Sequence, residues 1–407
     1  MKKTVLRSVL TLAVVGVTLA TTIGCTSSKA TSDSDAVIVP GVTEDSITLG
    51  IIADLTGPFA STGVPTVEGA KHYWQTHQVC ERSVELVVKD TEYKTDRAKT
   101  AYAELRDDVL AIQATTATPI TVVNMDDFAK DDMMVIAVPA PDLAENDNIL
   151  LAGTLNDVEM MNGVSYAVDN LGVQEGDVIG AIYLNNDFGK ASLVGVEEAA
   201  DLAGLTLVSQ PAEVTDKDMT AQITALGGAG VSAVFVAGSA GVLNSAVTIA
   251  RAQGLDVPFI ASAGAFDASA LETSAGPGLE ENTYFVAYVA PFGDGSDGPS
   301  ANRAALEESG SGAHPSHWMN LGWGMATIMD QALSAACKDG DLTRAGLLAV
   351  VDGLGEVETG GAIVPLEFDL RSPGMMSYVL RPDPSMIDGL RIEEQPFIGE
   401  LTATLNE

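Results

Sequence analysis

Basic residues are scarce in this chain of 407 residues, in which 21 Lys and Arg stand against 56 Asp and Glu. The formal net charge is −35. A surface this acidic repels nucleic-acid phosphates and anionic lipid headgroups. We therefore expect no nucleic-acid partner. Saline surroundings would also favour such acidity, so the charge does not identify the ligand.

Two further absences bear on chemistry. No Gly-rich loop of either common phosphate-binding type is present, which argues against a nucleotide cofactor. Histidine is rare, and the pair His314 and His317 has no acidic or Cys partner at a metal-ligand spacing. The sequence therefore predicts neither a cofactor nor a metal site.

Long apolar runs are missing after the N-terminal segment, and about 20 apolar residues are needed to cross a bilayer. Residues 1–24 combine a basic head, a short apolar stretch and small residues, which is typical of a secretory signal peptide. Cys25 follows Ile23 and Gly24 directly and resembles the lipidated Cys of a bacterial lipobox. We expect an exported protein, lipid-anchored through Cys25 to the outer face of the cell membrane. Loss of the leader takes the formal charge to −38.

Bulky residues are almost absent from the stretch that follows. Residues 25–46 are rich in Ser, Thr, Asp and Ala, so they cannot bury enough area to offset their ordering entropy. We interpret them as a flexible tether. The remaining residues, about 360, exceed one ordinary domain, and two lobes are expected.

Cysteine is limited to three residues. With Cys25 taken by lipid, Cys80 and Cys337 form an even pair in an oxidising compartment. A disulfide between them is therefore expected.

Short apolar runs alternate with amphipathic helical stretches along the rest of the chain. This alternation predicts an α/β fold of parallel sheets covered by helices on both faces. The runs of strand length are 47–54, 84–90, 109–114, 133–138, 177–184, 205–210 and 231–237. The helical stretches include 64–77, 97–106, 191–202 and 243–253.

Strand-like runs at 150–154 and 283–290 are interpreted as crossings between two Rossmann-like lobes, and 362–369 as a third. The first lobe is then 47–153 with 287–351, and the second is 154–286 with 362–407. Three crossings form a hinge about which two lobes can close on a ligand.

Several segments resemble the solute-binding proteins of branched-chain amino acid ABC transporters. The resemblance rests on ITLGIIADLTGPF at 47–59, LVVKDTEY at 86–93, YLNNDFGK at 183–190, VFVAG at 234–238 and ARAQG at 250–254. It covers essentially the whole chain from residue 46. It implies a type I periplasmic-binding fold and a monomer that delivers a small solute to ABC permease subunits.

In such a fold, ligands bind where the carboxyl ends of the strands face the cleft. Thr115, Thr116 and Thr118 lie at such a strand end, before Pro119 at the start of a helix. Their hydroxyls and nearby backbone N–H groups would hold a ligand carboxylate; a helix cap, the alternative, needs only one Thr. The expected ligand-binding residues are Ser61, Thr62, Thr115, Thr116, Thr118, Ala140, Phe188, Ser239, Ala240, Phe266, Asp267 and Trp318.

The sequence departs from the family at the residue that pairs with a ligand ammonium. Ala263 stands where amino acid binders of this family have Glu or Asp, although Asp267 is near enough to substitute. A buried ammonium without a partner costs several kcal/mol. A carboxylate, amide, urea-like or aromatic acid ligand therefore remains open beside an amino acid.

Two other functions compete with transport. Ser239 lies in a strand–Ser–helix turn with small neighbours, which resembles the nucleophile elbow of serine hydrolases. Asp267 and then His314 or His317 follow in hydrolase order. The order of residues alone is weak support, so we expect no enzyme. A sensory lipoprotein of the same fold is the second alternative.

Overall fold

The computed structural model describes residues 39–368 and 374–406. The predicted signal peptide, Cys25 and the first part of the predicted tether lie outside these residues. Residues 39–45, by contrast, lie against the first lobe: the backbone N–H of Thr48 donates to the Gly41 carbonyl at 2.7 Å, and that of Ser83 to the Asp45 carbonyl at 3.0 Å. The end of the predicted tether is therefore part of the folded lobe.

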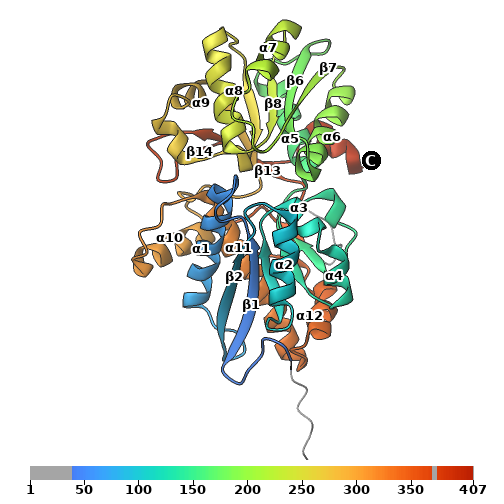
Figure 1. Ribbon diagram of the computed structural model, residues 1–407, viewed down its shortest axis with the longest axis vertical. Coiled ribbons are helices and arrows are strands. Elements are labelled where there is room, and N and C mark those ends of the chain that lie inside the picture. The colour runs from blue at the N-terminus through green and yellow to red at the C-terminus, as the bar shows by residue number, and fades with distance from the viewer. Residues whose placement is uncertain (1–38, 369–373, 407) are drawn as a thin grey trace, which may run out of the picture. The chain divides into compact units, whose positions relative to one another are not determined.

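The first lobe is built on a five-stranded parallel sheet in the order β2-β1-β3-β4-β5. Figure 1 labels its strands β1 and β2. The strands are β1 (Ser46–Ala53), β2 (Ser83–Asp90), β3 (Ala111–Thr115), β4 (Val135–Ala137) and β5 (Ile149–Leu151). Its helices are α1 (Ala60–Thr76), α2 (Thr95–Leu105), α3 (Thr118–Val122), α4 (Met125–Lys130), α10 (Asp297–Ser309), α11 (His317–Asp339) and α12 (Arg344–Val350). This lobe also contains two short 3₁₀ turns, η1 (Pro141–Leu143) and η4 (Val351–Gly353). It contains a two-stranded ribbon of β11 (Glu356–Val357) and β12 (Leu366–Glu367) as well.

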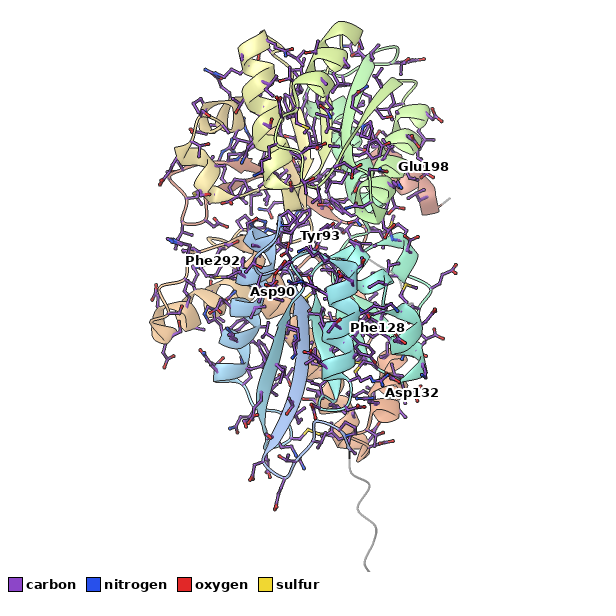
Figure 2. The ribbon with its side chains drawn as sticks, viewed as in Figure 1. Asp90, Tyr93, Phe128, Asp132, Glu198 and Phe292 are labelled. Carbon is purple, nitrogen blue, oxygen red and sulfur yellow. A yellow bond between two sulfur atoms is a disulfide. The ribbon has the colours of Figure 1, made fainter. Side chains whose placement is uncertain are left out.

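Both faces of this sheet are buried. Successive strand residues point to opposite faces, so Ile51 packs in the cluster with α1 and α11 while Ile52 packs in the cluster with α2 and α3. Phe128 of α4, labelled in Figure 2, belongs to the second cluster and is fully buried. Two buried faces explain the near-continuous apolar strands.

The second lobe contains a seven-stranded mixed sheet in the order β14-β13-β10-β9-β8-β6-β7. Its parallel strands are β6 (Val178–Leu184), β7 (Thr206–Ala212), β8 (Val234–Ala237), β9 (Phe259–Ser262) and β10 (Thr283–Ala287). The antiparallel strands β13 (Ser377–Pro382) and β14 (Leu390–Phe397) extend it at one edge. The helices are α5 (Asn156–Asn170), α6 (Asp187–Leu202), α7 (Thr220–Ala229), α8 (Ala240–Gln253), α9 (Gly276–Asn282) and α13 (Glu400–Ala403), with 3₁₀ turns η2 (Ala263–Ala265), η3 (Ala268–Glu272) and η5 (Thr404–Asn406).

The α/β architecture confirms the predicted fold class, with one correction. The prediction of parallel sheets missed β13 and β14, which run antiparallel to their neighbours. The polar residues of β14 gave no strong strand signal, and β14 joins the sheet only through β13, which pairs with β10. The second sheet is therefore mixed.

Residues 362–368 lie beside the first lobe, because the Ala290 N–H donates to the Ala362 carbonyl at 3.2 Å and the Val364 N–H to the Tyr288 carbonyl at 2.9 Å. The predicted third crossing at 362–369 ends outside the described residues and stays a prediction. Gly374 next donates to the Gly153 carbonyl at 3.0 Å, beside the first crossing. Gly153 has φ +144°, and a Cβ there would lie 2.2 Å from the Tyr288 ring, so this crossing requires glycine.

A disulfide joins Cys80, in the turn before β2, to Cys337 near the end of α11, with their Cα atoms 6.2 Å apart. This span lies within the range that disulfides accept. In the described part of the chain, no helix combines the length and apolar character needed to cross a bilayer.

Candidate functional site

A pocket of about 60 Å³ is lined by residues of both lobes. The lining residues are Phe59, Thr62, Tyr93, Thr116, Ala117, Thr118, Val138, Asn156, Glu159, Phe188, Ser262, Ala263, Gly264, Tyr288 and Trp318.

Five side chains in this lining have a buried polar atom without a hydrogen-bond partner among the described residues. The atoms are Thr62 Oγ1, Asn156 Nδ2, Glu159 Oε1, Ser262 Oγ and Trp318 Nε1. Each of these residues is at most 5% exposed. Buried polar groups are nearly always paired, because an unpaired one costs free energy. Five of them converging from α1, α5, β9 and α11 indicate a site for a polar ligand group.

Glu159 is the acidic side chain in the lining. It extends from the first turn of α5, and burial raises the pKa of its carboxyl group to about 8. A hydrogen bond from the backbone N–H of Ala263 opposes that rise. No Lys, Arg or His belongs to the described lining. An ionised Glu159 would therefore be a buried charge without a cation beside it.

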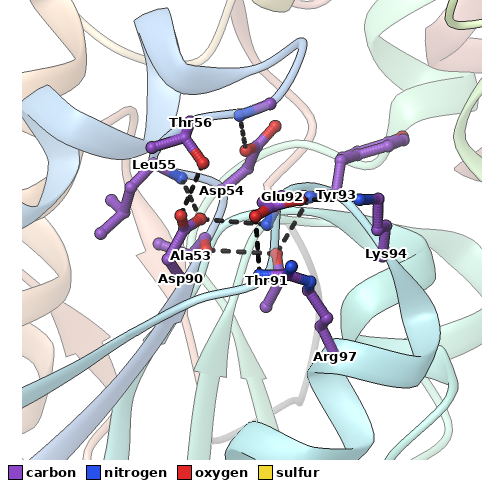
Figure 3. Close-up of polar contacts among 11 residues, drawn as sticks. Ala53, Asp54, Leu55, Thr56, Asp90, Thr91, Glu92, Tyr93, Lys94 and Arg97 are labelled. Atoms are coloured by element: carbon purple, nitrogen blue, oxygen red, sulfur yellow. Dashed lines mark hydrogen bonds and ion pairs between the residues drawn. The ribbon is translucent and has the colours of Figure 1, made fainter.

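The loop after β1 positions one wall of the pocket. Asp54 is fully buried, and its carboxylate accepts hydrogen bonds from the backbone N–H groups of Gly57 at 2.6 Å and Phe59 at 2.8 Å. Figure 3 shows this loop beside the end of β2. A Cβ at Gly57 would lie 2.5 Å from the Asp54 carboxylate, so the turn requires glycine here. The Phe59 ring is thereby held against the pocket.

The turn after β2 positions Tyr93. Asp90 accepts hydrogen bonds from the Leu55 N–H at 2.9 Å and the Thr56 hydroxyl at 2.6 Å, which lowers the pKa of its carboxyl group despite partial desolvation (Figure 3). Glu92 and Tyr93 follow with φ +49° and +58°. Two successive non-glycine residues in the left-handed region are costly and cluster at functional sites. Here they direct the Tyr93 side chain to the pocket.

Contacts between the lobes surround Tyr93, which is labelled beside Asp90 in Figure 2. The Asn186 side chain, at the start of α6, donates to the Tyr93 hydroxyl at 3.0 Å. The Phe59 ring meets Tyr93 at 4.7 Å and Phe188 edge-on at 6.3 Å between centroids. Burial raises the pKa of Tyr93, so it stays neutral at ordinary pH. Aromatic rings of both lobes thus surround the polar groups.

The structure brings part of the sequence-predicted site together. Thr62, Thr116, Thr118, Phe188 and Trp318 line the pocket. Thr115 does not, because it lies in β3 and its hydroxyl accepts a hydrogen bond from the Thr121 hydroxyl at 2.7 Å. The helix after this cluster, α3, has only five residues.

The other predicted residues lie elsewhere. Ser61, Phe266 and Asp267 line a neighbouring groove of about 850 Å³, and Asp267 accepts hydrogen bonds from Ser269 as the cap of η3. Ala140, Ser239 and Ala240 line neither cavity. Ser239 directly precedes α8 and is buried.

Sequence reasoning missed five prominent lining residues: Tyr93, Asn156, Glu159, Ser262 and Tyr288. The strongest available signal was Glu159, a charged residue between Val158 and Met160 in an otherwise buried helix face. Asn156 and Ser262 offered no signal, because small polar residues at element ends usually serve as caps.

Residues 46–376 match the family model described as periplasmic binding protein. A fatty acid ABC transporter substrate-binding protein from Thermomonospora curvata is 31% identical over 90% of this chain and 95% of that chain, with a TM-score of 0.85. A branched-chain amino acid ABC transporter protein from Thermus thermophilus with bound valine is 18% identical over 89% and 99% of the chains, with a TM-score of 0.79.

A possible leucine/isoleucine/valine-binding protein from Rhodopirellula baltica is 17% identical over 88% of this chain and 98% of that chain, with a TM-score of 0.74. No match was found among curated proteins. The matched family consists of non-catalytic substrate-binding proteins, which removes the hydrolase alternative for Ser239. The chain belongs to the periplasmic binding protein family and is an ABC transporter solute-binding protein of the type I fold.

Proposed function

We propose that this protein captures a solute with a carboxylate head and an apolar body between its lobes and delivers it to an ABC importer. The observation that supports this most strongly is the group of five unpaired polar atoms. Trp318 Nε1 and Asn156 Nδ2 can only donate hydrogen bonds, so the ligand must offer acceptors. The Thr116 and Thr118 side chains add hydroxyl groups to the lining.

The rest of the lining is suited to an apolar body. Phe59, Phe188, Tyr288 and Trp318 contribute aromatic rings, and Val138 an aliphatic side chain. Ligand pockets are commonly built in this way, with few polar groups that orient the ligand and apolar walls that supply affinity. The named ligands of the relatives, a fatty acid and valine, both contain a carboxylate attached to an aliphatic part.

A thermal-shift screen of the purified soluble domain tests the proposal. The panel contains short and medium fatty acids, branched-chain amino acids, the matching amides and neutral sugars. A ligand at 100 times its dissociation constant adds about 2.7 kcal/mol to the free energy of unfolding. We expect the largest shift from a carboxylate. Stabilisation by an amide or a sugar, with none by any carboxylate, would contradict the proposal.

Delivery and membrane attachment need tests in cells. Deletion of the gene should abolish uptake of the radiolabelled carboxylate that the screen identifies, and the intact gene should restore it. Uptake unchanged by the deletion would favour a sensory role.

We further propose that Cys25 carries the lipid anchor. Cys25→Ser should release the protein from membranes, and lipid labelling that persists in this variant would refute the anchor.

A further inference from the structure

Glu159 gives the pocket a feature that a simple carboxylate site lacks, because an acidic side chain lies among the groups that would meet the ligand's head. We propose that Glu159 binds the ligand as a protonated carboxylic acid and donates a hydrogen bond to its carboxylate, so that the site selects carboxylates without an α-ammonium group. This inference rests on the proposed function and names the substrate class of the same site.

The position of Glu159 supports this role. It lies three residues after Asn156 on α5, so both side chains are on one face of the helix. The backbone N–H of Ala263 donates to its carboxyl group, while Oε1 has no partner among the described residues. With 3% exposure, Glu159 is closed off from bulk water. Its unpaired oxygen can therefore be satisfied by a bound ligand.

The hydrogen-bonding capacity of the five unpaired groups matches an anion. Trp318 and Asn156 are obligate donors at the unpaired atoms, and the hydroxyls of Thr62 and Ser262 can donate. A ligand carboxylate accepts about four hydrogen bonds. Trp318, Asn156 and a protonated Glu159 supply three of these donors, and the hydroxyl of Thr62 or Ser262 supplies the fourth. An α-ammonium would instead bring three donors into a group of side chains that is already rich in donors.

The tyrosine and histidine side chains around Glu159 stay neutral near neutral pH. Burial raises the pKa values of Tyr288 and of Tyr93 across the pocket. Burial lowers the pKa of His317, at the start of α11 beside Trp318, to about 3. Asp157 on α5 and Asp54 behind Phe59 have raised pKa values but do not line the pocket. Among the described lining residues, Glu159 is thus the group expected to change charge between about pH 7 and 9.

Proton linkage makes the proposal measurable. The pKa of Glu159 is about 8, so most of the empty protein carries the proton at pH 7 and little does at pH 9. A ligand that needs the protonated form should lose affinity about tenfold between about pH 7 and 9. A ligand whose ammonium needs the ionised form should gain affinity about tenfold over the same range. The affinities of the two kinds of ligand should therefore change with pH in opposite directions.

Isothermal titration calorimetry with matched pairs provides the test. Each pair differs only by an α-ammonium: 3-methylbutanoate and valine, hexanoate and norleucine, octanoate and 2-aminooctanoate. We expect the carboxylate of at least one pair to bind about tenfold or more tightly than its amino counterpart. Titrations in phosphate and in Tris near pH 8 should show uptake of about half a proton per ligand bound.

Substitutions separate the protonated from the ionised form. Glu159→Gln retains a neutral donor, so it should bind the carboxylate within about threefold of wild type and remove the loss of affinity between pH 7 and 9. Glu159→Ala should lower affinity about tenfold or more. Asp388→Asn is a matched control: it removes another buried carboxyl group with a raised pKa, outside the pocket, and should keep the wild-type pH profile.

Three outcomes would overturn the inference. One is tighter binding of the amino members with proton release. Another is a Glu159→Gln protein that is folded but has lost carboxylate binding. The third is wild-type affinity for the carboxylate that does not fall between pH 7 and 9. If no member of any pair binds, the proposed function itself fails, so the two failures are distinguishable.

Discussion

The carboxyl group of Glu159 on α5 accepts a hydrogen bond from the backbone N–H of Ala263, directly after β9. Position 263 is where the family resemblance predicts an acidic side chain, and the sequence has alanine there. The structure therefore supplies a carboxyl group at this place from another helix. Because that group is buried without a cation beside it, it favours the neutral form, whereas a salt-bridged acid favours the ionised form.

The Trp318 indole N–H should contribute directly to affinity. Trp318→Phe keeps an aromatic ring but removes the unpaired donor, so affinity for the best carboxylate should fall about tenfold, as expected for one hydrogen bond to a charged group. Trp323→Phe is the matched control, because Trp323 packs against Tyr73 and His77 outside the pocket. Calorimetry measures the carboxylate affinity of both variants. Equal losses of affinity in the two would contradict a specific role for Trp318.

The Thr cluster should divide into binding and structural members. Thr116→Val with Thr118→Val removes two lining hydroxyls while keeping shape, and should reduce carboxylate affinity at least tenfold. Thr115→Val should leave affinity unchanged but lower the free energy of unfolding by up to about 1 kcal/mol, since the Thr121 hydroxyl loses one of its two acceptors and keeps the Ala117 carbonyl. Urea unfolding and ligand titration of both variants provide the comparison. Lost affinity in Thr115→Val alone would refute this division.

Asp388 should make stability depend on pH. Burial raises the pKa of its carboxyl group to about 6, against hydrogen bonds that include one from the Phe292 N–H at 2.6 Å. An acid whose folded-state pKa is raised favours folding fully below its unfolded pKa of 3.8, and this contribution is lost as pH rises through 6. Asp388→Asn should therefore stabilise the protein by about 2–3 kcal/mol near pH 8 and by little near pH 4. Denaturant midpoints of both proteins at pH 4 and pH 8 measure the gain in stability. An equal gain at both pH values would contradict the role of Asp388.

The Cys80–Cys337 bridge should stabilise the first lobe by linking two segments 257 residues apart in the chain. Replacing both cysteines by serine should lower the free energy of unfolding by about 2–5 kcal/mol, chiefly because the unfolded chain gains freedom. Thiol titration of the denatured, unreduced domain without Cys25 should detect almost no free thiol. Two titratable thiols would show that the bridge does not form in the isolated protein.

Local patterns in the sequence were sufficient for the architecture. Apolar runs such as 47–54 and 177–184 coincide with β1 and β6 because strands buried on both faces need uninterrupted apolar residues. The turn LTGPF was identified from its residues, and Gly57 is required there by the Asp54 carboxylate. The edge strand β14 was missed because a half-exposed antiparallel strand has a weaker pattern. The neighbouring strand β13 was missed although most of its residues are buried.

The sequence by itself determined most of the strands and helices, and it selected Thr62, Thr116, Thr118, Phe188 and Trp318, which line the pocket. Only the tertiary structure decided that Thr115 bonds to Thr121 and that Glu159 lies beside Ala263, 104 residues later in the chain. The reason is physical: periodicity records which face of an element is buried, and that is a local property. Which polar atoms remain unpaired within a buried region depends on how distant elements pack together, and no local pattern encodes it.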